Sequence, residues 1–254
     1  MKNVRVSFIT ALLIAAASLF GAPGARATVV DLINGDSGVL NGGAIADWTD
    51  FKATGSGDVQ SFLRVQADGT EQGYNTSGSP LPFDDKAGAF THDITFADLL
   101  TTEVTLGGQN YFKLLLDVAQ LSNSPLISLD DLRIYTSATG SLTTTNLSLL
   151  GTLRYSFTGN DKILLDASRN SGNGSGDMFL YIPVSAFAGT LSTDFVYLYC
   201  LFGTTYGTNG GPEEWSLIVN AVPEVSTFFP IVGLLAAVFS TQFIRRRQLQ
   251  HVSK

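Results

Sequence analysis

Cysteine is nearly absent from this chain of 254 residues, and its scarcity excludes one means of stabilisation. Cys200 is the one cysteine, so no disulfide can form within the chain. In a strand, Cys200 shares a face with Val196, Leu198 and Phe202. The pattern therefore favours a small buried hydrophobic side chain over a reactive thiol.

Histidine is also scarce, which argues against the commonest catalytic and zinc sites. The chain has two histidines, and His251 lies close to its C-terminus. A hydrolase triad would depend on His92, and no Gly-x-Ser-x-Gly motif accompanies it. With one cysteine, His92 cannot complete a zinc site either. We expect His92 to be a surface or strand-edge residue and the protein not to be an enzyme.

Basic residues are few in the middle of the chain. Residues 28–222 hold 8 lysines and arginines against 21 aspartates and glutamates, a net charge of −13. Nucleic-acid binding needs Lys and Arg on the phosphates, so a nucleic-acid partner is disfavoured. The acidity fits solubility outside the cell and binding of divalent cations.

The middle of the chain alternates apolar and polar residues with the period of two that is typical of strands. Turn-forming Gly, Asn and Asp separate the runs. The pattern predicts a single all-β domain over 28–221, an antiparallel β-sandwich or jelly roll, with one helical turn at 96–100. The expected strands are 59–66, 111–118, 129–135, 147–157, 162–165, 178–184, 195–202 and 215–219.

The N-terminus has the order of features of a secretory signal peptide. Lys2 and Arg5 precede an apolar run of 13 residues, and Ala25-Arg26-Ala27 forms a small-x-small site. The run is too short to cross a bilayer core of roughly 30 Å as a helix. We expect residues 1–27 to be removed by cleavage before Thr28; a buried N-terminal helix is the alternative.

The C-terminus predicts a membrane anchor. Residues 228–244 form a run of 17 without a formal charge, about 25 Å as a helix. Arg245, Arg246 and Arg247 follow at once, and basic residues stay on the cytoplasmic side. The sequence therefore predicts a transmembrane helix followed by a short cytoplasmic tail over 248–254. The β domain would then lie outside the cytoplasm, in the periplasm, at the cell surface or in the medium. An amphipathic surface helix fits less well, because apolar residues occupy all sides of the segment.

The tail as a whole resembles a known sorting signal. Val222-Pro223-Glu224, then the apolar run, then the arginines at 245–247 resemble the PEP-CTERM signal of Gram-negative bacteria. The resemblance covers residues 222–247, and Val225 stands where the family usually has a second proline. It implies recognition of Pro223 and Glu224 by an exosortase, a membrane enzyme, with release or attachment at the surface of bacteria that make extracellular polysaccharide. An ordinary C-terminal anchor is the alternative.

One loop has the composition of a calcium site. Calcium takes six to eight oxygen ligands from carboxylates, carbonyls and amides, often in Gly-rich loops. The loop from Asp166 through Asn173 to Asp177 supplies such oxygens, without the spacing of an EF-hand. The alternative is a solvated hairpin loop in which Asp and Asn favour turns.

Aromatic residues and carboxylate pairs suggest two further hypotheses. If exposed, Trp48 and Trp215, with Tyr74 and Tyr206, would let the domain stack on sugar rings as a carbohydrate-binding module. The alternative is that these aromatic side chains lie in the core or cover it, as most such residues do. A glycan hydrolase or lyase would need two carboxylates from separate strands facing one groove, since neighbours on a strand point to opposite faces. The favoured interpretation remains a non-enzymatic surface or matrix protein associated with exopolysaccharide.

Overall fold

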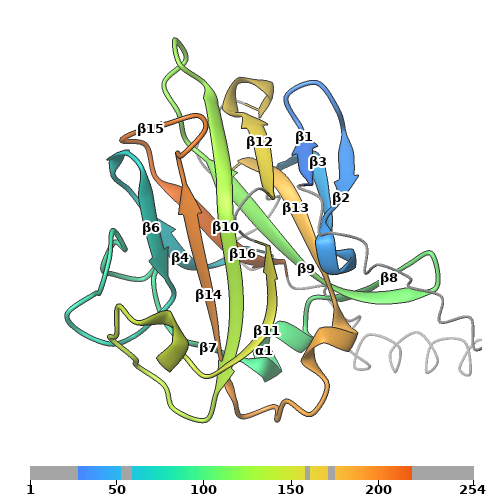
Figure 1. The fold of residues 1–254 in the computed structure, drawn as a ribbon, viewed down its shortest axis with the longest axis vertical. Coiled ribbons are helices and arrows are strands. Elements are labelled where there is room, and N and C mark those ends of the chain that lie inside the picture. The colour runs from blue at the N-terminus through green and yellow to red at the C-terminus, as the bar shows by residue number, and fades with distance from the viewer. Residues whose placement is uncertain (1–27, 53–58, 158–160, 171–174, 219–254) are drawn as a thin grey trace, which may run out of the picture.

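Two seven-stranded sheets pack face to face and enclose one hydrophobic core (Figure 1). The computed structural model describes residues 28–52, 59–157, 161–170 and 175–218. The signal peptide, the transmembrane segment 228–244 and the tail lie outside these residues. Within the described ranges, none of the helices is long and apolar enough to cross a membrane.

The first sheet has the order β1-β12-β10-β14-β6, with β11 beside β10 and β7 beside β14. Its strands are β1 (Val29–Asp31), β6 (Glu71–Tyr74), β7 (Ile94–Thr95), β10 (Leu126–Ser137), β11 (Thr152–Phe157), β12 (Lys162–Asp166) and β14 (Phe195–Phe202). Among the described strands, β1 and β12 are the one parallel pair, so the expectation of purely antiparallel sheets is wrong there.

The second sheet has the order β2-β3-β13-β9-β16-β4, with β8 beside β9. Its strands are β2 (Ser37–Val39), β3 (Ile45–Lys52), β4 (Val59–Val65), β8 (Glu103–Leu106), β9 (Gln109–Val118), β13 (Ser175–Pro183) and β16 (Glu213–Ile218). A two-stranded ribbon joins β5 (Asp68–Gly69) to β15 (Thr208–Asn209).

Helical structure in the described residues is short. The segments are α1 (Phe96–Leu100), η1 (Asn41–Gly43), η2 (Leu147–Leu149), η3 (Ala167–Asn170) and η4 (Val184–Phe187). The predicted turn at 96–100 is confirmed as α1, which a capping box between Thr95 and Asp98 begins. The strand expected from residue 147 begins only at Thr152, because Asn146 caps η2 by accepting from the Ser148 N–H at 3.1 Å.

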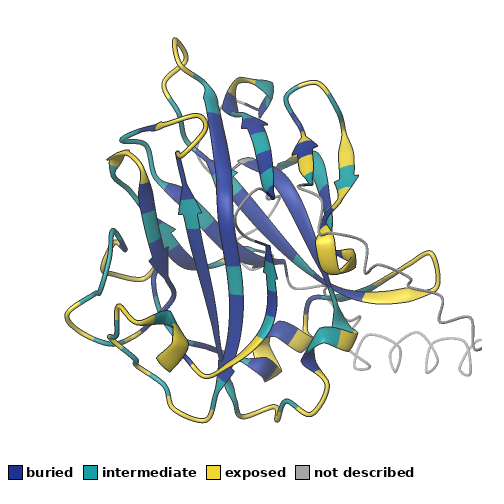
Figure 2. Cartoon of the chain, viewed as in Figure 1, coloured by how far each residue is buried: buried dark blue, intermediate teal, exposed yellow. Residues whose placement is uncertain are grey.

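The alternation seen in the sequence places alternate side chains in the core. On β9, Phe112, Leu114, Leu116 and Val118 are buried between the sheets, as predicted. Figure 2 shows the buried positions following the middle strands of both sheets. Burial of apolar area at roughly 25 cal/mol per Å² makes this core the main stabilising contribution.

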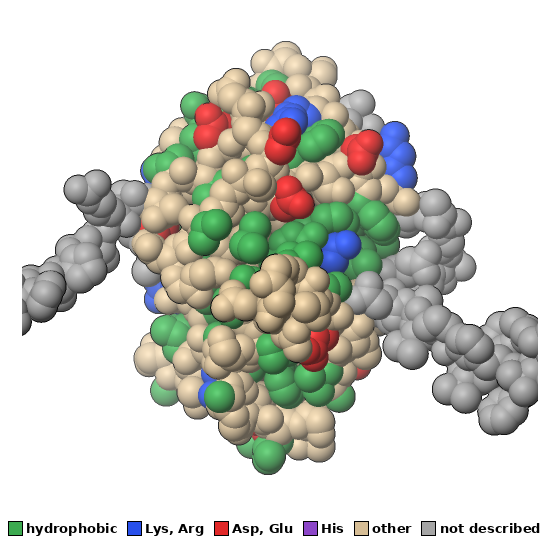
Figure 3. All heavy atoms as spheres, turned by 90° about the vertical axis from the view of Figure 1, so that its right-hand side faces the viewer, with side chains coloured by type: hydrophobic (Ala, Val, Ile, Leu, Met, Phe, Trp, Pro, Cys, Tyr) green, Lys and Arg blue, Asp and Glu red, His purple; other side chains and the backbone are tan. Residues whose placement is uncertain are grey.

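The outer faces of both sheets also carry apolar clusters. Tyr74, Tyr197 and Tyr199 project from the first sheet, and the Tyr74 hydroxyl donates to the carbonyls of Leu142 and Thr144, both at 3.0 Å. This fixes the loop before β11 over the sheet. The second cluster consists of Tyr111, Leu115, Phe179, Tyr181 and Ile218. The side of the molecule where β2, β3 and β8 lie shows a band of hydrophobic side chains (Figure 3).

Candidate functional site

Residues 84–86 close the edge where the chain passes from β4 in one sheet to β6 in the other. The Gln66 N–H donates to the Asp84 carbonyl at 3.2 Å, and the Asp84 N–H donates to the Gln72 carbonyl at 3.0 Å. Asp85 forms a β-bridge with Val65. The segment therefore joins the two sheets through backbone hydrogen bonds, and the side chain of Asp85 is buried, 7% exposed.

Glu71 and Glu213 lie inside this closed edge and come from different sheets. Glu213 on β16 pairs with Val118, so its side chain faces the core together with that of Trp215. Glu71 on β6 pairs with Phe202. The two glutamates are 1% and 0% exposed, so both carboxyl groups are removed from bulk water.

The two glutamate carboxyl groups lie close enough for each to affect the protonation of the other. Glu71 Oε2 also accepts from the Ala67 N–H at 2.6 Å, and Gln120 Nε2 donates to Glu213 Oε1. In the described residues no donor reaches Glu71 Oε1 or Glu213 Oε2. Burial without a donor on these two oxygens disfavours the ionised form of both carboxyl groups.

Burial and mutual repulsion set the protonation of this pair. Burial raises the pKa of Glu71, although the hydrogen bonds from Glu213 and the Ala67 N–H lower it in part. Burial raises the pKa of Glu213 well above its usual value, and the hydrogen bond and charge of Glu71 raise it further. Both carboxyl groups are therefore easier to protonate inside the domain than in water, Glu213 with the additional contribution of Glu71.

Asp85 and Cys200 extend the buried cluster. Burial raises the pKa of Asp85 to about 8, the charge of Asp84 adds to the shift, and the Tyr74 N–H offsets only part of it. In the described residues neither carboxyl oxygen of Asp85 has a hydrogen-bond partner of good geometry. Burial also raises the pKa of the Cys200 thiol, and the charges of Asp85 and Glu71 reinforce that shift.

A glycine makes room for this arrangement. A Cβ atom on Gly73 would lie 1.7 Å from Asp85 Oδ1 and 2.6 Å from Val65 Cγ1. The carboxyl group of Asp85 therefore sits directly against the backbone of β6, where any larger residue would displace it.

The cluster couples protonation to stability, but it does not face a substrate. Asp85, Glu71 and Glu213 are each at most 7% exposed, so a soluble sugar cannot reach them. Each has a folded-state pKa raised above its ordinary value. The contribution of these three carboxyl groups to the stability of the folded domain is complete below the ordinary pKa of a carboxyl group. It is lost as the pH rises through the raised pKa of the folded state.

The sequence indicated this cluster only in part. Glu213 is in phase with Trp215 and Leu217 at a spacing of two, which places it on their face of β16. Glu71 and Asp85 carry no comparable signal, because their burial depends on contacts between segments far apart in the chain.

The predicted calcium ligands fall in different surroundings. Asp177 Oδ2 accepts from the Val118 N–H at 2.8 Å, and burial raises the pKa of Asp177 to about 8. Asp166 Oδ1 accepts from the N–H and hydroxyl of Ser168 at 2.8 and 2.6 Å. Asn173 lies outside the described residues, and no group of three or more His, Cys, Asp or Glu side chains arranged for a metal occurs within them. Calcium binding stays a prediction, while the alternative of a solvated loop is wrong at Asp177, which is 1% exposed.

The aromatic candidates are mostly buried. Trp215 and Tyr74 are both 0% exposed, so the alternative of core residues holds for them and the hypothesis that they stack on a sugar is wrong. Trp48 is half-buried against the core, and the guanidinium of Arg169 lies 4.2 Å from its ring centroid. Tyr206 is 36% exposed, the one member of the four with a large accessible area.

The other sequence predictions divide between confirmed and untested. Cys200 is fully buried in the core, as predicted. His92 is half-buried and lines a shallow pocket of about 360 Å³ together with Thr76 and Thr91. The sorting residues at 222–224 and 245–247 lie outside the described residues.

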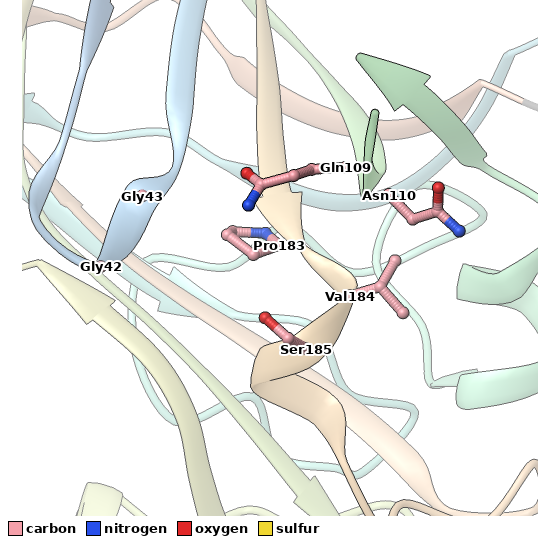
Figure 4. Close-up of a pocket in the computed structure, with 7 residues that line it drawn as sticks. All are labelled: Gly42, Gly43, Gln109, Asn110, Pro183, Val184 and Ser185. Atoms are coloured by element: carbon pink, nitrogen blue, oxygen red, sulfur yellow. The ribbon is translucent and has the colours of Figure 1, made fainter. Parts of the chain in front are cut away.

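A second shallow pocket, of about 430 Å³, lies where η1, the start of β9 and the end of β13 meet (Figure 4). Its polar side chains are those of Gln109, Asn110 and Ser185. Asn110 Nδ2 donates to Glu103 Oε1 at 2.7 Å, which orients the amide. None of the described residues that line it carries an aromatic ring, so these residues offer hydrogen bonds without a stacking surface.

No protein-family model, curated protein or solved structure matches this chain.

Proposed function

We propose that this chain is an exported, non-enzymatic protein of the bacterial surface or extracellular matrix, sorted through its PEP-CTERM-like tail. A signal peptide over 1–27 directs export, and an exosortase-type membrane enzyme recognises Pro223 and Glu224. The helix at 228–244 anchors the chain in the inner membrane at least transiently, and exopolysaccharide is the partner of the β domain.

The observation that supports this proposal most is the position of the sandwich in the chain. The first described residue with backbone hydrogen bonds is Thr28, and the last described strand ends at Ile218. The strands therefore lie between the two segments that the sequence assigns to export and to sorting. Ile218 is four residues before Val222, so little chain separates the domain from the signal.

The placement of the buried acids supports a non-enzymatic role. The carboxyl pair that bridges two strands, Glu71 and Glu213, is enclosed in the core rather than placed on a groove. A glycosidase needs its acid and base on either side of a bound glycosidic bond. The geometry of this pair therefore favours a structural role.

Cell fractionation of a Pro223→Ala/Glu224→Ala variant tests the sorting proposal. We expect the wild-type protein outside the inner membrane and the variant retained in it with its tail. The matched control is Val225→Ala, which alters the neighbouring residue and should leave sorting intact. Equal distribution of wild type and double variant in the membrane fraction would leave only an ordinary anchor.

Carbohydrate binding at the pocket of Figure 4 is a second candidate function. The amides of Gln109 and Asn110 and the hydroxyl of Ser185 can pair with sugar hydroxyl groups. Titration of the protein with the host's exopolysaccharide should show binding that a Gln109→Ala/Ser185→Ala variant loses. Unchanged binding in the variant would exclude this pocket.

A further inference from the structure

The start of the sandwich is fixed through the backbone of Thr28. The Thr28 nitrogen donates to Asp161 Oδ1 at 2.7 Å, and its carbonyl accepts from the Lys162 N–H at 3.0 Å. Val29 then pairs with Lys162 in the parallel β1–β12 ladder. Both polar backbone groups of Thr28 therefore have partners on one short segment, residues 161–162.

Asp161 is an unusual partner, because it is a buried carboxylate whose hydrogen-bond donors are neutral. It is 8% exposed, and Asn41 Nδ2 donates to both of its oxygens at 2.9 and 2.8 Å. The adjacent Lys162 ammonium points elsewhere and donates to the hydroxyl of Thr205 at 2.7 Å. In the described residues, no Lys, Arg or His forms an ion pair with Asp161. A buried carboxylate without a counter-charge is costly, so the site favours a cation.

Asn41, the other hydrogen-bond donor to the Asp161 carboxylate, is itself held by a hydrogen bond. The hydroxyl of Tyr155 donates to the Asn41 carbonyl at 3.0 Å, which holds the Asn41 backbone in place. The titratable groups near the carboxylate are thus the phenol of Tyr155 and the ammonium of Lys162. Among the described residues, neither group forms an ion pair with Asp161, since the phenol is neutral and the ammonium is hydrogen-bonded to Thr205.

We propose that Asp161 is the receptor for the α-ammonium group that signal-peptide removal creates on Thr28, so that processing adds a buried ion pair to the folded domain. The inference rests on the proposed export, which places the cleavage before Thr28. Hydrolysis of the Ala27–Thr28 peptide bond consumes one water and yields a carboxylate on Ala27 and an amine on Thr28, which takes up a proton at neutral pH. The neutral N–H···O contact becomes a charge-assisted one, which is roughly twice as strong.

The test compares residues 28–254 with a free α-amine and the same chain acetylated on that amine. Acetylation removes the positive charge but keeps an N–H donor. The acetylated chain therefore reproduces the neutral hydrogen bond between the Thr28 N–H and Asp161 that exists before cleavage. At pH 6 we expect the free-amine form to unfold about 2 to 8 °C higher. Both forms carry the same buried carboxyl groups, so the pH dependence of those groups cancels in the difference.

The pH profile of that difference has a defined sign. A carboxylate partner raises the pKa of the α-amine above its ordinary range of about 7.7–8.0. The advantage of the free amine is therefore complete below about pH 7.7 and disappears as the pH rises through the raised value. An advantage that persists unchanged to pH 11 would overturn the ion pair.

Asp161→Asn provides the decisive comparison, because it keeps the shape of the side chain and removes its charge. The advantage of the free amine should fall to less than about 1 °C in this variant. The same advantage with and without the Asp161 carboxylate would overturn the proposal. If the variant does not fold, the rate at which an acylating reagent modifies the Thr28 α-amine of the wild-type chain provides the test. At pH 7 this amine should react more slowly in the folded chain than in the chain unfolded in urea. Equal rates would contradict the ion pair.

N-terminal sequencing of protein from exporting cells separates this inference from the export proposal. A start at Thr28 without coupling to Asp161 would overturn the inference and leave export standing. A start at another residue would overturn both the predicted cleavage site and the role of Asp161 as receptor of a processed terminus. A start at Thr28 with coupling supports both.

Discussion

Replacement of Asp85 by Asn should change how the stability of the domain depends on pH. Asp85 is 7% exposed, and burial raises its pKa from 3.8 to about 8. Between pH 5 and 7 the native state then holds one proton more at this site than the unfolded chain does. The linkage relation gives a loss of about 1.4 kcal/mol of unfolding free energy per pH unit, or about 3 kcal/mol over this range.

The sign follows from the raised pKa. The contribution of Asp85 to stability is complete below pH 3.8 and is lost as the pH rises towards about 8. Asn resembles the protonated carboxyl group but does not titrate. The Asp85→Asn variant should therefore gain about 3 kcal/mol relative to wild type on going from pH 5 to pH 7.

Urea unfolding at pH 5, 6 and 7 measures this effect, with extrapolation of the free energy to water. Asp50→Asn is the matched control, since it removes one carboxyl group from an exposed position and should keep the wild-type slope. Parallel profiles for wild type and Asp85→Asn would refute the reasoning. The domain would then accommodate an ionised Asp85, through water or a bound cation.

Three further predictions test the packing around this cluster. Gly73→Ala should lower the free energy of unfolding in urea by about 1–3 kcal/mol, because the added Cβ would displace the Asp85 carboxyl group. An unchanged unfolding midpoint would show that the Asp85 carboxyl group can move aside at little cost. Cys200, which is 0% exposed, should react with a thiol reagent only in denaturant, and rapid reaction of the native protein would contradict its burial. In a Trp48→Phe variant, iodide should scarcely quench the fluorescence of Trp215, and strong quenching would place that indole at the surface.

Much of the strand pattern could be predicted because alternation is a local property. The strand at 195–202 and the helical turn at 96–100 have the bounds that the sequence suggested. The short strands β1 and β2 were not expected, since three residues are too few to show a period. The parallel contact between β1 and β12 joins segments more than 130 residues apart, and no local pattern reports it.

The chemistry of the interior was harder to predict than the strands. Neighbouring carboxylates on a strand were expected to point to opposite faces, and Glu213 and Glu214 do: Glu213 is buried and Glu214 forms an ion pair with Arg64. Which of the two faces is the core depends on β4 and β9, the neighbours of β16. The hypothesis that Trp215 binds a sugar is wrong, because Trp215 is in phase with Leu217 and both side chains lie inside the sandwich.

The intact mass of the protein recovered from the cells that export it tests the central claim most directly. One measurement reports both ends of the chain, and the proposed function predicts a polypeptide that begins at Thr28 and ends near Glu224. A mass that corresponds to residues 1–254 would contradict both export processing and sorting through the tail.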